Sequence, residues 1–330
     1  MTGISRRKVS GLLGGGLAAA ALGIKSPAVW AQSNMTKLRI GVVPVLDAGA
    51  FFIAQAQDYF AKERLEITVT PTPGGGPSMA ALVAGQLNIS MSTVTTMIQS
   101  QQEGLDLKII SGISGAKPFP HDYSAIMVRK GSGIKTGKDV VGKTGATHLL
   151  QNLPWIATRL WIDTTGGDSA KAKIIEVQFP QQEDALLNNR VDYIATNEPF
   201  MSAIMATHAD KVEIISGLMG TMLPNTVVAG FAASGDYIGK NKEVIDAFAR
   251  AYQKAADWAQ ANKGSPEMIE PVAKFTKLSP ERLKALIAWP EYIKTIDPTN
   301  LDRIATAMKQ YGAIKDVPDT KALLYQTALG

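Results

Sequence analysis

The sequence has no cysteine and only three histidines, His121, His148 and His208. The lack of cysteine excludes disulfides, thiolate metal sites, iron–sulfur clusters, cysteine nucleophiles and a lipid anchor on an N-terminal cysteine. Because no two histidines lie close together in the chain, a histidine-rich metal site is not expected either. We therefore expect neither a metal nor a cofactor.

The chain also has little net charge once its beginning is set aside. The 330 residues carry a formal charge of +5. The first 31 residues contain four basic side chains and no acidic one, which leaves 30 basic against 29 acidic residues in the remainder. A protein that binds nucleic acid or a membrane surface needs a basic patch to displace counterions. The nearly neutral body therefore argues against either partner.

Residues 1–31 have the order of a secretory signal. Arg6 and Arg7 precede an apolar, glycine-rich run at 9–24, and the small residue Ala31 offers a cleavage site. The run is short for a bilayer core, which needs about 20 strongly apolar residues. Paired arginines before a weakly hydrophobic core resemble a twin-arginine signal. We expect export by the twin-arginine machinery, removal of residues 1–31, and a mature protein that diffuses in the periplasm.

Hydrophobic periodicity after the leader predicts alternating strands and helices. Strands are expected at 37–43, 66–70, 88–91, 107–110, 124–128, 173–177, 193–196 and 226–233, with a further unit beginning at 142–146. Helices are expected at 50–63, 79–84, 94–103, 154–161, 183–189 and 241–262, and another begins at Ser279-Pro280. Strands alternating with helices predict an α/β fold with mainly parallel sheets.

Five segments resemble one family of proteins. They are Lys37-Leu-Arg-Ile-Gly-Val-Val43, Ala54-Gln-Ala-Gln-Asp-Tyr-Phe60, Leu82-Val-Ala-Gly-Gln-Leu-Asn-Ile89, the stretch 133–143, and Val191-Asp-Tyr-Ile-Ala-Thr-Asn-Glu-Pro-Phe200. In this order and spacing the segments resemble the extracytoplasmic solute-binding proteins of ABC importers. The likeness is greatest to the group that takes nitrate, taurine, sulfonates and pyrimidine precursors of thiamine, and it covers most of residues 37–240.

The resemblance implies a two-lobed periplasmic binding protein fold of type II, the "Venus flytrap", with two hinge crossings and a helical C-terminal tail. Lobe one would comprise 36–123 plus 230–330, and lobe two 124–229. The protein would be a monomer that delivers a small solute to an ABC permease, whose ATPase is a separate subunit, and would not be an enzyme. Two alternatives stay open: an enzyme of the pyrimidine-precursor synthase type, whose cysteine-rich motif this chain lacks, and a ligand-sensing partner of a membrane receptor.

Ligands of open α/β sheets bind beyond the carboxyl ends of the strands, where helix N-termini offer free N–H groups. The candidate ligand-binding residues are those that follow predicted strands or flank the crossings: Asp47, Phe51, Gly75, Gly76, Ser92, Thr93, His121, Thr147, His148, Gln151, Glu198 and Asn225. None of the candidate segments contains arginine or lysine, which disfavours a phosphate held bidentately. A singly charged anion and a flat aromatic or pyrimidine-like solute both remain open.

One motif is misleading. Residues 137–144 match the phosphate-binding pattern G-x-x-x-x-G-K-[ST], which requires a strand before the first glycine and a helix after the lysine. No hydrophobic strand precedes Gly137, and the residues after Lys143 predict strand and loop. We expect no nucleotide hydrolysis there. The adjacent carboxylates Glu183 and Asp184 would point in different directions from one helix and lie in solvent.

Overall fold

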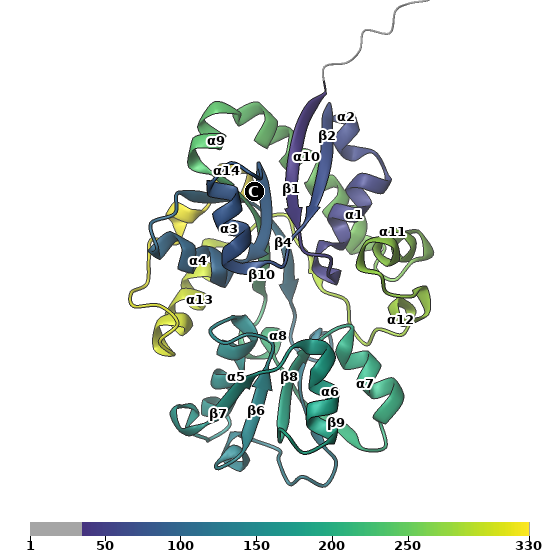
Figure 1. Ribbon diagram of the computed structural model, residues 1–330, viewed down its shortest axis with the longest axis vertical. Helices are drawn as coiled ribbons and strands as arrows, with labels where there is room; N and C mark the ends of the chain where they lie inside the picture. Colours follow the sequence, from purple (N-terminus) through teal and green to yellow (C-terminus); the bar gives the residue numbers. More distant parts are fainter. Residues whose placement is uncertain (1–34, 330) are drawn as a thin grey trace, which may run out of the picture. The chain divides into compact units, whose positions relative to one another are not determined.

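The structure is a computed structural model that describes residues 35–329 (Figure 1). The predicted signal peptide, its twin-arginine pair and its cleavage site lie outside the described residues. Within the described range, no helix is both long and apolar enough to pass through a bilayer. The elements of residues 35–329 are organised around two sheets.

The first sheet has six strands in the order β11-β4-β10-β3-β1-β2. Their bounds are β1 Thr36–Val42, β2 Leu65–Pro71, β3 Ile89–Thr93, β4 Leu107–Ala116, β10 Thr226–Ser234 and β11 Glu291–Tyr292. Strands β1, β2 and β3 pair in parallel, whereas β10 runs antiparallel to both β3 and β4. The long apolar run at 226–233 thus returns the chain to the middle of the first sheet.

The second sheet has five strands in the order β7-β6-β8-β5-β9. Their bounds are β5 Ser124–Arg129, β6 Thr144–Thr147, β7 Lys173–Glu176, β8 Tyr193–Asn197 and β9 Val212–Gly217. Strands β6, β7 and β8 are parallel, and β5 is antiparallel to its neighbours β8 and β9. Each sheet therefore contains a parallel trio whose carboxyl ends share one edge.

Helices cover both faces of the first sheet. On one face lie α1 (Gly49–Ala56), α2 (Tyr59–Lys62), α10 (Lys242–Ala261) and α11 (Pro266–Thr276), and on the other α3 (Gly75–Val83), α4 (Val94–Gln102) and α13 (Pro298–Gln310). The shorter elements are η1 (Leu46–Ala48), α9 (Gly235–Lys240), α12 (Pro280–Lys284), η4 (Lys321–Leu323) and α14 (Gln326–Leu329). The expected start at Ser279 is correct, because its hydroxyl caps α12 by accepting from the Arg282 N–H at 3.3 Å.

The helix expected over 50–63 is broken into α1 and α2. Asp58 adopts a left-handed backbone conformation with φ of 57° between them. The periodicity of apolar residues continues through this break, because Phe60 still packs its ring on Phe51 at 5.4 Å between centroids. A pattern of buried side chains alone therefore could not reveal the interruption.

The second sheet carries α5 (Leu153–Thr164), α6 (Phe179–Leu187), α7 (Phe200–His208) and α8 (Met219–Met222), with single turns η2 (Gly137–Val140) and η3 (Ser169–Lys171). The chain passes between the two halves from β4 to β5 and again from β9 to β10 (Figure 1). The two-lobed α/β fold with two crossings and a helical C-terminal tail is therefore confirmed.

The segment that matches the phosphate-binding pattern is a single turn that leads into a strand. Gly137 begins η2, and β6 follows at Thr144, so no helix starts at the lysine. A Cβ at Gly137 would come within 2.0 Å of the carbonyl oxygen of Ile162, so this glycine allows the turn to pack closely on α5. The requirements of a phosphate loop are not met.

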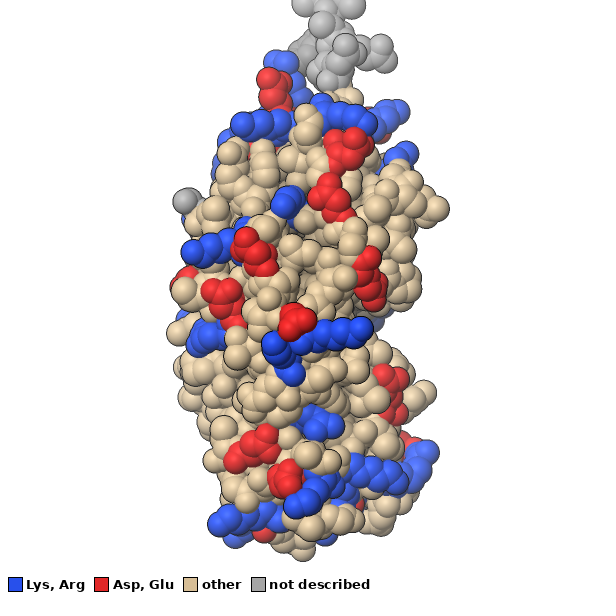
Figure 2. All heavy atoms as spheres, turned by 90° about the vertical axis from the view of Figure 1, so that its left-hand side faces the viewer, with Lys and Arg blue, Asp and Glu red and all other residues tan. Residues whose placement is uncertain are grey.

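Positive and negative side chains are interspersed over the face of the molecule that Figure 2 shows. No continuous band of lysine and arginine crosses that face. This agrees with the nearly balanced count of charged residues after the leader.

Candidate functional site

A pocket of about 560 Å³ lies between the two sheets. Its walls come from both halves of the described chain and from Tyr123 on the first crossing. Most of the lining residues are apolar, among them Met91, Phe179 and Met219, and no lysine or arginine of the described residues lines it. The pocket is large enough for a small organic molecule.

The position of the pocket follows from the two parallel trios. The loops that line it leave the carboxyl ends of β1, β2 and β3 in one half and of β6, β7 and β8 in the other. The floor is completed by Val228 and Ala229 near the start of the antiparallel strand β10. Strand ends that share an edge bring polar side chains from distant parts of the sequence together.

Asp47 is the one carboxylate among the lining residues. It lies in η1, directly after β1, and its Oδ1 accepts hydrogen bonds from Ser114 Oγ at 2.5 Å and from Tyr123 OH at 2.9 Å. Burial raises the pKa of Asp47 above 3.8, because removal from water disfavours the charged form more than these two hydrogen bonds favour it. The site thus holds an acidic group without a cationic partner.

The N-terminus of α3 forms another part of the wall. Gly74 and Gly75 both have positive φ, 79° and 66°, a backbone conformation that residues with a Cβ rarely adopt. A Cβ at Gly75 or Gly76 would meet no atom within 4 Å, so the backbone is open to approach by a ligand. No side chain caps this helix, whereas Thr93 and Asn152 cap α4 and α5.

The second half contributes a flat aromatic surface. The imidazole of His148 stacks on the ring of Phe179 with centroids 4.5 Å apart and planes 7° apart, and Phe179 stacks in turn on Phe200. Burial lowers the pKa of His148 below 6.5, which favours the neutral imidazole at pH 7. His148 and Phe179 both line the pocket.

Two further polar side chains of the pocket have no partner within the described residues. Ser92 is 2% exposed, and its hydroxyl oxygen makes no hydrogen bond. The side-chain oxygen of Asn197, at the end of β8, is also buried without a donor. A buried polar group without a partner costs free energy, so it is retained where a bound molecule supplies the partner.

The buried carboxylate of Asp122, outside the pocket, accepts hydrogen bonds on both of its oxygens. Asp122 accepts from Ser124 N and Oγ through Oδ1, and from Leu218 N, Thr221 N and Thr221 Oγ1 through Oδ2, at 2.7–3.1 Å. This single side chain ties the first crossing to the second.

Two contacts join the halves away from the crossings. Glu198 accepts from Ser202 and from the backbone N–H groups of Ile287 and Ala288, the latter at 3.0 and 3.3 Å. Near the other side, the Tyr311 hydroxyl donates to Asp163 Oδ2 at 2.9 Å. In Figure 1 the elements that carry these contacts lie on opposite flanks, with α7 and α12 on the right and α5 and α13 on the left.

The candidate residues from the sequence fall into two sets. Those that line the pocket are Asp47, Gly75, Gly76, Ser92, Thr93 and His148. Thr147, the last residue of β6, is buried just behind the pocket wall, and Gln151 is exposed in the same loop.

The remaining candidates lie elsewhere for clear physical reasons. Phe51 packs in the core against Phe60 and Phe231. Glu198 takes part in the contact with residues 287–288. The exposed residues His121 and Asn225 line two other cavities beside Lys117, at the crossings.

The candidates from sequence omitted Tyr123, Phe179 and Asn197, whereas Asn152 belongs to the expected loop segment Gln151-Asn152 and lines the pocket. Asn197 and Phe179 follow strands that were expected at 193–196 and 173–177, so the rule of strand ends would have found them. Tyr123 carried no such signal, because it reaches the pocket through the crossing.

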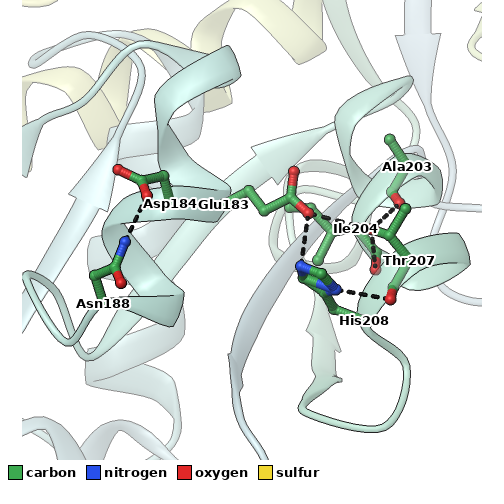
Figure 3. A network of polar contacts seen from close by, with 7 residues as sticks. All are labelled: Glu183, Asp184, Asn188, Ala203, Ile204, Thr207 and His208. Atoms are coloured by element: carbon green, nitrogen blue, oxygen red, sulfur yellow. Dashed lines mark hydrogen bonds and ion pairs between the residues drawn. The ribbon is translucent and has the colours of Figure 1, made fainter.

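The paired carboxylates of α6 are separated. Figure 3 shows Glu183 directed at α7, where it accepts from Thr207 Oγ1 at 3.1 Å and lies 3.5 Å from His208 Nε2. Asp184 instead accepts from Asn188 on its own helix. The two carboxylates face different partners, so they do not form a two-carboxylate site.

Comparisons with known proteins agree with this geometry. A family model described as NMT1/THI5 like matches residues 46–265. The chain is 21% identical to a protein of Brachyspira hyodysenteriae described as an ABC transporter periplasmic binding protein, over 72% of this chain and 70% of that one. It is 19% identical to the bicarbonate-binding protein CmpA of Synechococcus over 71% of this chain, but that match spans only 56% of CmpA.

The fold has a solved counterpart. The crystal structure of the periplasmic aliphatic sulphonate binding protein SsuA from Escherichia coli superposes with a TM-score of 0.75 and 19% identity. The match covers 89% of this chain and 98% of that one. These three relatives are binding proteins, and the two whose ligands are named, CmpA and SsuA, take different ones.

Proposed function

Because this chain belongs to the NMT1/THI5-like family, we propose that it is the extracytoplasmic solute-binding component of an ABC importer. It encloses a small molecule between its lobes and delivers it unchanged to a membrane permease whose ATPase is a separate subunit. The observation that carries the proposal is the pocket of about 560 Å³ with walls from both sheets. The likeness to a periplasmic binding protein over 72% of the chain adds support.

Binding closes the lobes by hinge motion at the two crossings. The moving bodies are residues 36–123 with 230–330 and residues 124–229. Asp122 holds the crossings together, so they bend as one hinge. The protein is a monomer in the periplasm, exported through the twin-arginine machinery and freed of residues 1–31.

The lack of cysteine makes this motion measurable, since two introduced cysteines can be spin-labelled specifically. Glu66→Cys on β2 and Lys173→Cys on β7 place labels on exposed residues of the two lobes. The test panel comprises nitrate, bicarbonate, methanesulfonate, taurine, cytosine, benzamidine and amino acids. At least one member should shorten the distance between the labels and be recovered chemically unchanged.

The matched control blocks the pocket. Gly76→Trp places an indole where a Cβ meets no atom, so the chain should fold and yet not close on the same solute. If no panel member changes the distance between the labels, the proposal fails. Conversion of a panel member to a product would instead identify an enzyme.

A further inference from the structure

Two buried carboxylates, Asp122 and Glu198, differ from the half-buried Asp47 in how their oxygens are used. Asp122 and Glu198 each accept hydrogen bonds on both oxygens. Ser114 and Tyr123 both donate to Oδ1 of Asp47, no other side chain of the described residues donates to this carboxyl group, and its own backbone N–H is a third donor. An ionised carboxylate has about four acceptor positions, so Asp47 keeps capacity for a donor that enters the pocket.

The electrostatics of the pocket favour the same kind of ligand. Within the described residues, no lysine or arginine lines it, and the one histidine in its wall has a lowered pKa. Asp47 therefore supplies the one carboxyl group of the described lining, and no cationic side chain there would hold an anion. A cationic or neutral N–H donor at this place can bond to the unused acceptor positions of this carboxyl group.

A second acceptor faces the ligand from the other lobe. The side-chain oxygen of Asn197 is buried without a donor, and Ser92 offers an unpartnered hydroxyl on the side of Asp47. Between these groups the wall is apolar, and His148 stacked on Phe179 gives it a flat face. The arrangement fits a planar, mostly apolar body with hydrogen-bond donors at its edge.

We propose that the solute is a flat organic molecule that donates an N–H to Asp47 Oδ2 and a second to Asn197 Oδ1. Its chemical class is an amidine, an amine or an N–H heterocycle, and inorganic anions and simple sulfonates are excluded. This inference rests on the proposed function, because it assigns the ligand of the same pocket.

The test measures binding by calorimetry with two donor probes and two anions. Benzamidine represents a cationic donor, cytosine a neutral one, and nitrate and methanesulfonate the anions. The variant Asp47→Asn keeps an oxygen that can accept from Ser114 and Tyr123 but removes the charge. Asp236→Asn, in an exposed ion pair with Lys240 on α9, is the matched control.

Wild type and Asp236→Asn should bind at least one donor probe and neither anion. A hydrogen bond to a charged group contributes about 1.5–3 kcal/mol, and one between neutral groups about 0.5–1.5 kcal/mol. Asp47→Asn should therefore weaken the binding of benzamidine about 10- to 150-fold, or the binding of cytosine about 2- to 10-fold. The size of the loss tells a cationic ligand from a neutral one. Asn197→Ala should weaken the same probe, which tests the second acceptor without altering Asp47.

Three results would overturn the inference: tighter binding of an anion than of either donor, equal binding of the donor by Asp47→Asn and wild type, or no binding of either donor. In each case the distance between the spin labels tests the proposed importer function independently of the ligand class. Closure upon nitrate or methanesulfonate would leave the importer role intact and reject the ligand class alone.

Discussion

Asp122 is buried in the first crossing, whereas Asp47 is half-buried in the pocket wall beside it, and their hydrogen bonding differs as well. Five donors from the two crossings surround Asp122, whereas two hydroxyls serve one oxygen of Asp47. The carboxylate at the crossings thus has internal donors on both of its oxygens, whereas the carboxyl group in the pocket keeps unused acceptor positions. Groups that the chain satisfies itself hold the fold, and the unsatisfied groups in the pocket wall, Ser92 and Asn197, are the ones that a ligand can reach.

The largest effect should come from removing the carboxylate at the crossings. Asp122→Ala would remove the acceptor of two hydroxyls and of the Ser124 and Thr221 N–H groups, while the Leu218 N–H keeps the Ser124 carbonyl oxygen as its acceptor, and each buried unsatisfied donor costs about 1–3 kcal/mol. We expect the free energy of unfolding to fall by about 3 kcal/mol or more. Urea unfolding measures it. A loss below about 1 kcal/mol would show that water replaces these bonds readily.

Glu198→Ala should have the next largest effect, a loss of about 2 kcal/mol, because it removes the acceptor of the Ala288 amide and one of the two acceptors of the Ile287 amide, the other being Ser202 Oγ. Hydrogen exchange of these two amides should accelerate more than that of Tyr292, which donates to Gln260 instead. Equal acceleration at all three positions would contradict a local role for Glu198.

Asp47→Asn should change the stability of the ligand-free protein by no more than about 1 kcal/mol, in contrast to Asp122→Ala. The sign should depend on pH, because burial raises the folded-state pKa of Asp47 above 3.8. Its contribution to stability is then present below about pH 3.8 and is lost as pH rises through the raised folded value. The variant lacks this titration, so relative to wild type it should gain stability as the pH rises from 3.8 through the raised folded value. Urea unfolding across this range measures the trend, and a relative loss would contradict it.

The smallest effect is expected for Ser92→Ala, within about 0.5 kcal/mol of wild type, since the hydroxyl makes no internal bond. Ser124→Ala is the matched comparison. That hydroxyl donates to Asp122 and accepts from Met219 N, so its loss should cost about 1–2 kcal/mol. If thermal unfolding shows a larger loss of stability for Ser92→Ala than for Ser124→Ala, the proposed contrast between the hydrogen bonding at the crossings and that in the pocket does not hold.

Much of the fold could be predicted from the sequence because its strands are short apolar runs between turns. The strands expected at 37–43, 66–70 and 193–196 match β1, β2 and β8 closely. β9 at Val212–Gly217 was not predicted, since it is an edge strand held by antiparallel pairing to β5, which periodicity does not reveal.

The pocket residues that follow strands of the first sheet could be predicted from the sequence better than those from the second half. Asp47, Ser92 and Thr93 could be placed because each closely follows a strand of the first sheet or ends one. Which side chains of the second half reach the same space depends on how the lobes meet, and that is set by contacts such as Glu198 with Ile287. No spacing in the sequence records such a contact, so the place of Tyr123 in the pocket appeared only with the structure.

The residues that line the pocket all fall between Val43 and Ala229, whereas the contacts at Ile287 and Tyr311 come from the last quarter of the chain. The other partners of these contacts, Glu198 and Asp163, lie within the stretch that also lines the pocket. Substitutions in the last quarter of the chain can therefore retune how firmly the halves rest against each other, and the ease of release, without touching a residue that lines the pocket.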